Sequence, residues 1–160
     1  MARKTGYSGA TLTVKLTESL TIDGRDYGGS SSSTFSSIKN VTRRIETITT
    51  TEATIITFST VIGAGQYIAA NIAYMRFTNL DDTNFITLTF KNAADDEVAI
   101  KLDAGQTFVL AGDNSGGMAA MMNAIAGDAG SDTALGDLKD IQADANTGNC
   151  DVEIYIAGTA

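Results

Sequence analysis

Residues 149–156 read NCDVEIYI, and this stretch decides the fold class because apolar and polar side chains alternate along it. One side of the alternation is apolar and consists of Cys150, Val152, Ile154 and Ile156. The other side carries Asp151, Glu153 and Tyr155. A period of two is typical of a β-strand that buries one face. We therefore expect a strand here, with the four apolar side chains in the core.

The same period recurs along most of the chain. Residues 97–102 alternate in the same way, and residues 11–22 place five aliphatic side chains on one side of a strand that we expect to be half-buried. Further strands are expected at residues 38–50, 54–61, 67–80, 84–90 and 106–110. About eight to ten short strands separated by turn residues predict an all-β, single-domain β-sandwich, with a jelly roll as its specific form.

The connections between these strands have their own signals. Residues 27–33 (YGGSSSS) are typical of a flexible loop, and Asp81-Asp82-Thr83 is typical of a hairpin connection. A change of parity after Ile45 predicts a bulge or a bend. Residues 118–126 (MAAMMNAIA) predict a short helix, although nearby glycines weaken this prediction.

Two regions follow from these patterns: an extended amino-terminal arm at residues 1–9 and a β-sandwich domain at residues 10–160. Arg3, Lys4 and Tyr7 are the arm residues that we expect to contact a partner. Ordering an arm on a neighbouring subunit costs entropy that multivalent contact offsets. A frayed terminus is the alternative interpretation.

The charge of the 160-residue chain is −8 and is unevenly distributed. Residues 1–60 hold seven Lys and Arg against five acids (+2), and the remaining residues hold four against fourteen (−10). Such a chain is poorly suited to binding nucleic acid directly, because phosphate contacts need clustered positive charge. The asymmetry serves either solubility or head-to-tail complementarity between copies of the chain.

The residue types exclude several kinds of catalysis. The chain has no histidine, which excludes Ser-His-Asp and Cys-His nucleophile systems and imidazole metal sites. Its single cysteine, Cys150, is expected to be a buried structural thiol. No apolar stretch is long enough to predict a membrane span, and no secretory signal is recognised. We therefore expect a protein made in a cytoplasm that is not an enzyme and needs no cofactor.

Two groups of carboxylates are the remaining candidates for a binding site. Asp81 and Asp82 form one group, and Asp95, Asp96 and Glu97 form the other. Carboxylates in loops supply the oxygen ligands that Ca²⁺ prefers, and paired acids also hydrolyse or bind sugars. Neither group has the spacing of an EF-hand loop. They are weak calcium or glycan candidates, and solvated turns are the alternative.

Four stretches resemble small virion proteins of tailed bacteriophages, of the type frequent in marine and cyanobacterial phages. They are residues 16–24 (LTESLTIDG), 74–90 (YMRFTNLDDTNFITLTF), 98–110 (VAIKLDAGQTFVL) and 151–156 (DVEIYI). The resemblance covers a pattern of strands and turns over most of the chain. Residues 117–136 correspond least.

The resemblance implies a non-enzymatic structural subunit that is made in the host cytoplasm and assembled into the virion. The leading hypothesis is a capsid decoration or cement protein that binds the lattice of the major capsid protein or other virion subunits. It is expected to be a homo-oligomer, with a trimer favoured. A neck, tail or adaptor component is the alternative within this class, and a carbohydrate-binding host-attachment module is the alternative from another class.

Overall fold

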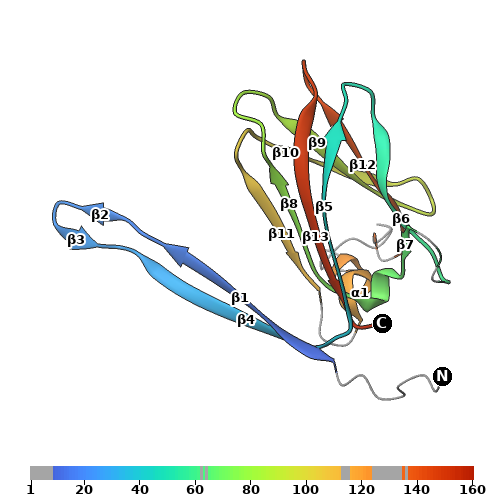
Figure 1. Cartoon of the computed structure of the whole chain (residues 1–160), viewed down its shortest axis with the longest axis horizontal. Coiled ribbons are helices and arrows are strands. Elements are labelled where there is room, and N and C mark those ends of the chain that lie inside the picture. Colours follow the sequence, from blue (N-terminus) through green and yellow to red (C-terminus); the bar gives the residue numbers. More distant parts are fainter. Residues whose placement is uncertain (1–8, 62, 64, 113–115, 124–134, 136) are drawn as a thin grey trace, which may run out of the picture.

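The chain folds into two packed β-sheets, from which a long hairpin projects (Figure 1). The computed structural model describes residues 9–61, 63, 65–112, 116–123, 135 and 137–160. The arm expected at residues 1–9, with Arg3, Lys4 and Tyr7, lies outside the described residues except for Gly9.

The first sheet has four antiparallel strands and the second has five. The four-stranded order is β11 (Thr107–Ala111), β8 (Ile72–Asn79), β13 (Cys150–Gly158) and β5 (Asn40–Ile48). The five-stranded order is β10 (Glu97–Leu102), β9 (Ile86–Asn92), β12 (Leu138–Ala145), β6 (Ala53–Phe58) and β7 (Gln66–Tyr67), with β7 parallel to β6.

The all-β fold and the β-sandwich are as predicted. The jelly roll stays a prediction, which the strand orders support because each sheet inserts a late strand between two early ones. β13 lies between β5 and β8, and β12 lies between β6 and β9.

The core lies between the two sheets. Strand β13 buries the side chains that its sequence predicts, with Val152 and Ile154 fully inaccessible. From the other sheet, Phe90 meets Phe77 and Phe108 edge-to-face, at ring-centroid distances of 6.4 and 6.1 Å. Such arrangements are favoured by the aromatic quadrupole. The core therefore fixes the two sheets face to face.

Short helices close one end of the sandwich. A 3₁₀ turn (η1, Ala69–Asn71) precedes β8, and α1 (Gly117–Met122) packs beside it. Gly117 has φ +57°, and a Cβ there would meet the Ala70 carbonyl oxygen at 2.4 Å, so this position requires glycine. The expected helix is present at its beginning, and residues 124–126 of the expected span lie outside the described residues.

Residues 10–38 form the projecting hairpin rather than part of the sandwich. β1 (Ala10–Glu18) pairs with β4 (Gly29–Ile38), and β2 (Thr21–Ile22) pairs with β3 (Arg25–Asp26) near its end. The two sandwich sheets thus begin at Asn40 instead of residue 10. The prediction of a flexible loop at residues 27–33 is wrong for residues 29–33. Pairing with β1 holds this serine run in an extended strand.

Two further local predictions were wrong. β5 pairs residue for residue with β13 from Ile48 to Asn40, so the parity change after Ile45 is not a bulge. Ile45 instead lies on the outer face of its sheet and is 62% exposed. Asp81–Thr83 connects β8 to β9 across the two sheets, so this turn is not a hairpin connection.

Candidate interaction surface

The projecting hairpin has one apolar face, and much of that face is exposed. Cross-strand partners share a face of a two-stranded ribbon, and residues two apart lie on the same face. Leu16 (60% exposed), Leu20 (51%), Ile22 (50%) and Tyr27 (58%) therefore lie along one face, since the Tyr27 N–H donates to the Leu20 carbonyl across the ribbon (2.8 Å). The half-buried strand expected at residues 11–22 is thus uncovered from Leu16 onward.

The root of the hairpin is anchored on the outer face of the four-stranded sheet. Phe35 and Ile38 of β4 are buried there, 7% and 5% exposed, in a small cluster with Tyr74 and Ala157. The rings of Phe35 and Tyr74 lie 5.9 Å apart. Burial raises the pKa of the Tyr74 hydroxyl, and the nearby Arg76 guanidinium opposes this rise. The root is therefore a second, smaller apolar core.

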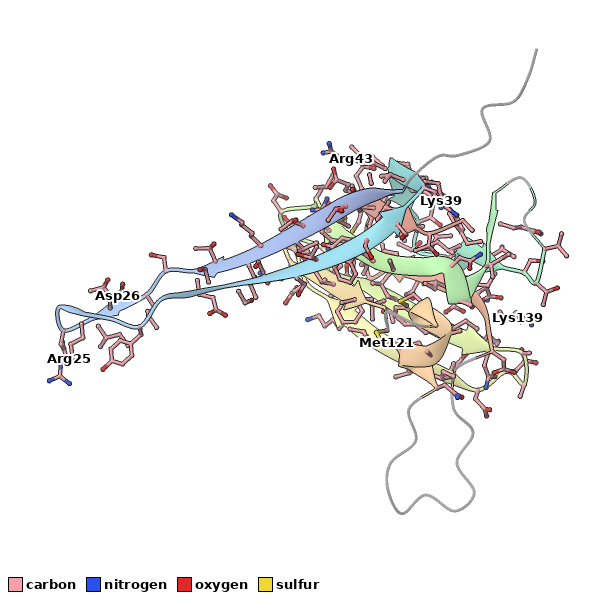
Figure 2. All side chains as sticks on the ribbon, turned by 90° about the horizontal axis from the view of Figure 1, so that it is seen from below. Arg25, Asp26, Lys39, Arg43, Met121 and Lys139 are labelled. Carbon is pink, nitrogen blue, oxygen red and sulfur yellow. The ribbon has the colours of Figure 1, made fainter. Side chains whose placement is uncertain are left out.

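The rest of the hairpin extends away from the sandwich. Figure 2 shows Arg25 and Asp26 at the far end of the ribbon, beyond the body formed by the two sheets. Within the described residues, β1 and β4 pair with each other alone. An isolated two-stranded ribbon is marginally stable in water. A surface that covers the exposed apolar face would stabilise it.

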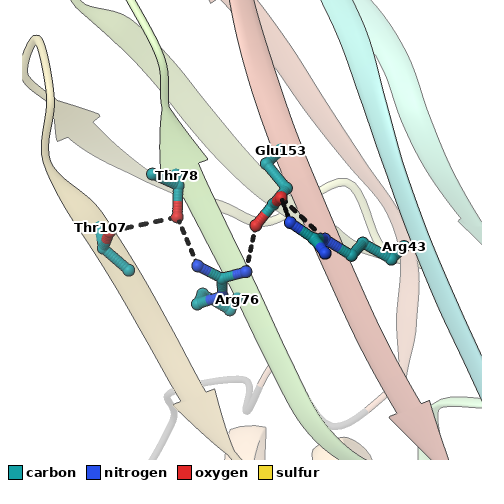
Figure 3. Close-up of polar contacts among 5 residues, drawn as sticks. All are labelled: Arg43, Arg76, Thr78, Thr107 and Glu153. Carbon is teal, nitrogen blue, oxygen red and sulfur yellow. Dashed lines mark hydrogen bonds and ion pairs between the residues drawn. The ribbon is translucent and has the colours of Figure 1, made fainter. Parts of the chain in front are cut away.

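Next to the hairpin root, the outer face of the four-stranded sheet carries an ion-pair network (Figure 3). The Glu153 carboxylate of β13 accepts hydrogen bonds from Arg43 Nε (2.8 Å) and Nη2 (2.6 Å) on one side. On the other side it accepts a bond from Arg76 Nη2 of β8. Arg76 Nη1 also donates to Thr78 Oγ1 (3.1 Å), which lies 3.1 Å from Thr107 Oγ1.

The network holds its carboxylate ionised. Hydrogen bonds from Arg43 are the main cause that lowers the pKa of Glu153, burial opposes this, and the Arg76 charge lowers it further. The Arg76 guanidinium also lies 5.9 Å from the centre of the Tyr155 ring. These contacts fix two guanidinium groups at defined places on the sheet surface.

Exposed aliphatic side chains flank this network. Strand registers place Ile45 beside Glu153, and Val109 beside Arg76, on the same outer face. Their exposed fractions are 62% and 46%. We call this surface the sheet platform and define it by Arg43, Ile45, Arg76, Val109, Glu153 and Tyr155. It combines charge and apolar area, as interfaces between proteins do.

The first group of predicted site carboxylates lies in the turn after β8. Asp81 accepts hydrogen bonds from the backbone N–H groups of Asn84 (2.6 Å) and Thr83 (2.8 Å), and these bonds lower its pKa. Asp82 accepts a bond from the Thr83 hydroxyl (2.9 Å). Both carboxylates thus stabilise their own turn.

The second group lies at the opposite end of β9. Asp95 pairs with Lys139 (3.1 Å) and Lys91 (3.7 Å), and its hydrogen bond and charge interaction with Lys139 are the main causes that lower its pKa. Asp96 accepts a bond from Asn92 Nδ2 (3.0 Å), and Glu97 lies 3.8 Å from Lys91. The strand separates the two groups, so they do not combine into one site.

The described residues offer little chemistry beyond these contacts. Among them, no group of three or more His, Cys, Asp or Glu side chains is placed to hold a metal ion. Cys150 is 1% exposed, and burial is the main cause that raises the pKa of its thiol. No helix in the described part of the chain has the length and apolar character needed to cross a membrane.

A hollow of about 310 Å³ lies where β5 and β7 meet the carboxyl terminus. Asn40, Thr42, Tyr67 and Ala160 are among its lining residues. The Tyr67 hydroxyl donates to Thr42 Oγ1 (3.2 Å), and Asn40 Nδ2 donates to the Ala160 carbonyl. These polar groups are engaged in holding the edge of the sheet.

Comparisons with known proteins give one distant structural likeness. No protein-family model and no curated protein matches the chain. A solved structure described as "Bacillus endospore appendages form a novel family of disulfide-linked pili" aligns with a TM-score of 0.41 and 11% identity, over 99% of this chain and 98% of that one. A likeness at this level carries no argument about function. The projecting hairpin and the sheet platform are therefore the features on which a function must be argued.

Proposed function

We propose that this chain is a non-enzymatic structural subunit that works through repeated contacts with neighbouring subunits in a bacteriophage particle. The observation that carries the proposal is the apolar face of the projecting hairpin. Four large side chains on it are at least half exposed, at the end of a ribbon that the sandwich itself does not cover. Exposed contiguous apolar surface of this kind marks interaction sites.

The sandwich supplies the rigid support that such a contact needs. Its core is closed by buried aromatic and aliphatic side chains from both sheets, and the hairpin root is fixed to one sheet through Phe35 and Tyr74. A rigid body with one extended element can reach across a boundary between subunits. This shape suits a decoration or cement protein that binds the major capsid protein lattice, and the resemblance of the strand-and-turn pattern to phage virion proteins supports the same proposal.

Quantified mass spectrometry of purified particles tests this proposal. Hundreds of copies per particle are expected for a decoration protein, because it follows the repeated capsid lattice. About six or twelve copies would move the chain to the neck, tail or adaptor, whose rings have few subunits. Absence of the chain from purified particles would overturn the proposal.

A further inference from the structure

We propose that the hairpin of one copy of this chain packs its apolar face on the sheet platform of a second copy. This inference deepens the proposed function, on which it rests, by naming the partner of the hairpin. It commits to an asymmetric contact in which two different surfaces of the same chain meet.

The apolar face of the hairpin continues beyond the sheet on which its root packs. Leu12 and Val14 are covered at the hairpin root, where they pack with Phe35, whereas Leu16, Leu20 and Ile22 continue the same face into solvent. From Val14 to Asp23 the ribbon extends about 30 Å, at roughly 3.3 Å per residue. That reach is enough to cross the sheet of a neighbouring sandwich.

The sheet platform adjoins an existing contact of the same kind. The hairpin root covers the row of the outer sheet face that contains Tyr74 and Ala157. The next two rows along the strands contain the platform, where Ile45 and Val109 are exposed. The sheet therefore already binds the apolar face of a ribbon at its root and presents further apolar surface beside it.

The charges of the two surfaces are also complementary. The hairpin tip, residues 16–29, holds Glu18, Asp23 and Asp26 against Arg25 and has a net charge of −2. The platform holds Arg43 and Arg76 against Glu153, which leaves +1, in a chain whose total charge is −8. Arg43 is the more accessible of the two cations, with its side chain 68% exposed. Opposite charges on the two surfaces favour this pairing and disfavour contact between two tips.

The contact has a consequence for assembly. Because the tip and the platform are different surfaces, an open chain of bound copies keeps one free tip at one end and one free platform at the other until a ring closes. Such a heterologous contact builds rings or continuous arrays, which is the behaviour of a subunit used in many copies.

Light scattering after size-exclusion chromatography, over a series of protein concentrations, tests the contact in the isolated full chain. The wild-type chain is expected to assemble as its concentration rises. Ile22→Asp on the apolar face of the tip and Ile45→Asp on the platform should each raise the protein concentration at which half of the chains are assembled by about tenfold or more. Each substitution places a charge in a contact from which water is excluded. Thr21→Asp, on the opposite face of the hairpin, and Ala99→Asp, on the exposed outer face of strand β10 in the other sheet, are the matched controls and should assemble like wild type.

Mixing the two interface variants identifies the surfaces. Ile22→Asp keeps an intact platform and Ile45→Asp keeps an intact tip, so an equimolar mixture should form a one-to-one complex that neither variant forms alone. Assembly of Ile45→Asp by itself would show that tips bind tips and would overturn the proposal. A wild-type chain that stays monomeric throughout would also overturn it, and the hairpin would then bind a different protein. The particle stoichiometry above tests the proposed function separately.

Disulfide trapping is the second readout if a variant folds poorly. A chain carrying both Ile22→Cys and Ile45→Cys should form linked oligomers on oxidation, whereas one carrying Thr21→Cys and Ile45→Cys should not. Native Cys150 is 1% exposed and should not interfere. Equal linkage by both chains would contradict the proposed face.

Discussion

Replacing Glu153 by Gln removes the charge that joins two arginines on the sheet platform. The change keeps the shape of the side chain, and the Gln NH₂ group cannot accept bonds from a guanidinium. The side chain of Glu153 is 11% exposed, that of Arg76 is 28% exposed, and that of Arg43 is 68% exposed. The two ion pairs should therefore differ in strength, because solvent screens the exposed partner.

The magnitude follows from this difference. An exposed pair such as Arg43–Glu153 contributes about 0–1 kcal/mol. A largely buried, charge-assisted hydrogen bond such as that from Arg76 contributes about 1.5–3 kcal/mol. Glu153→Gln should thus lower the free energy of unfolding by about 1.5–4 kcal/mol, measured by urea denaturation followed by circular dichroism. Arg43→Met should cost less than about 1 kcal/mol and Arg76→Met more.

Double-mutant cycles provide the decisive comparison. Hydrogen bonds from Arg43 lower the pKa of Glu153 most, yet solvent screens this exposed pair. The coupling energy of Arg76 with Glu153 should therefore still exceed that of Arg43 with Glu153, and high salt should reduce the second coupling more than the first. Equal couplings, or a loss below about 0.5 kcal/mol for Glu153→Gln, would refute the reasoning from burial.

Three further predictions concern pH, the hairpin root and the thiol. The pKa of Glu153 is lowered below its usual value of 4.5, so the ionised carboxylate stabilises the fold above pH 4.5. This stabilisation is lost as the pH falls through the folded-state pKa. The difference in unfolding free energy between wild type and Glu153→Gln should therefore shrink as the pH falls through this range. A difference that stays constant in acid would contradict this. Phe35→Ala should detach the hairpin root at a cost of about 2 kcal/mol or more, which should appear as faster amide hydrogen exchange in residues 10–38 while exchange in the sandwich is unchanged. Phe90→Ala is the control and should speed exchange throughout the sandwich. Uniformly faster exchange in both variants would argue against a separate root. Cys150 should resist a thiol reagent in the folded chain at pH 8 and react fully in denaturant, because it is 1% exposed and burial raises its pKa; rapid labelling of folded protein would contradict this.

The sequence predicted strands best where alternation and burial agree. Residues 150–156 alternate as predicted, because β13 lies in the middle of its sheet and presents one face to the core. Residues 11–22 alternate as clearly, yet Leu16, Leu20 and Ile22 are exposed. Alternation shows that a strand is amphipathic, and it does not show what covers the apolar face.

Other elements were missed because their local signals point elsewhere. β12 (Leu138–Ala145) lies between β6 and β9, but its sequence LKDIQADA is rich in residues that are uncommon in strands. Its place is fixed by its neighbours on both sides, and Ile141 and Ala143 are buried there. The serine run of β4 was predicted as a loop for the same reason.

The candidate surface could be predicted only in part. The sequence suggested complementarity between copies from its uneven charge, but the two surfaces depend on strand register. Arg43, Arg76 and Glu153 lie on three different strands that become neighbours only in the sheet. The parity change after Ile45, which predicts a bulge or a bend, instead separates the exposed Ile45 of the platform from the buried Ile48.

The hairpin tip is expected to become covered when this subunit is assembled. Amide hydrogen exchange of residues 16–29, compared between dilute isolated protein and purified assembled particles, tests it most directly. We expect rapid exchange in the isolated protein and exchange slowed by about tenfold or more in the particles, with the core strand β13 slow in both. Equally rapid exchange of the tip in both states would contradict the account.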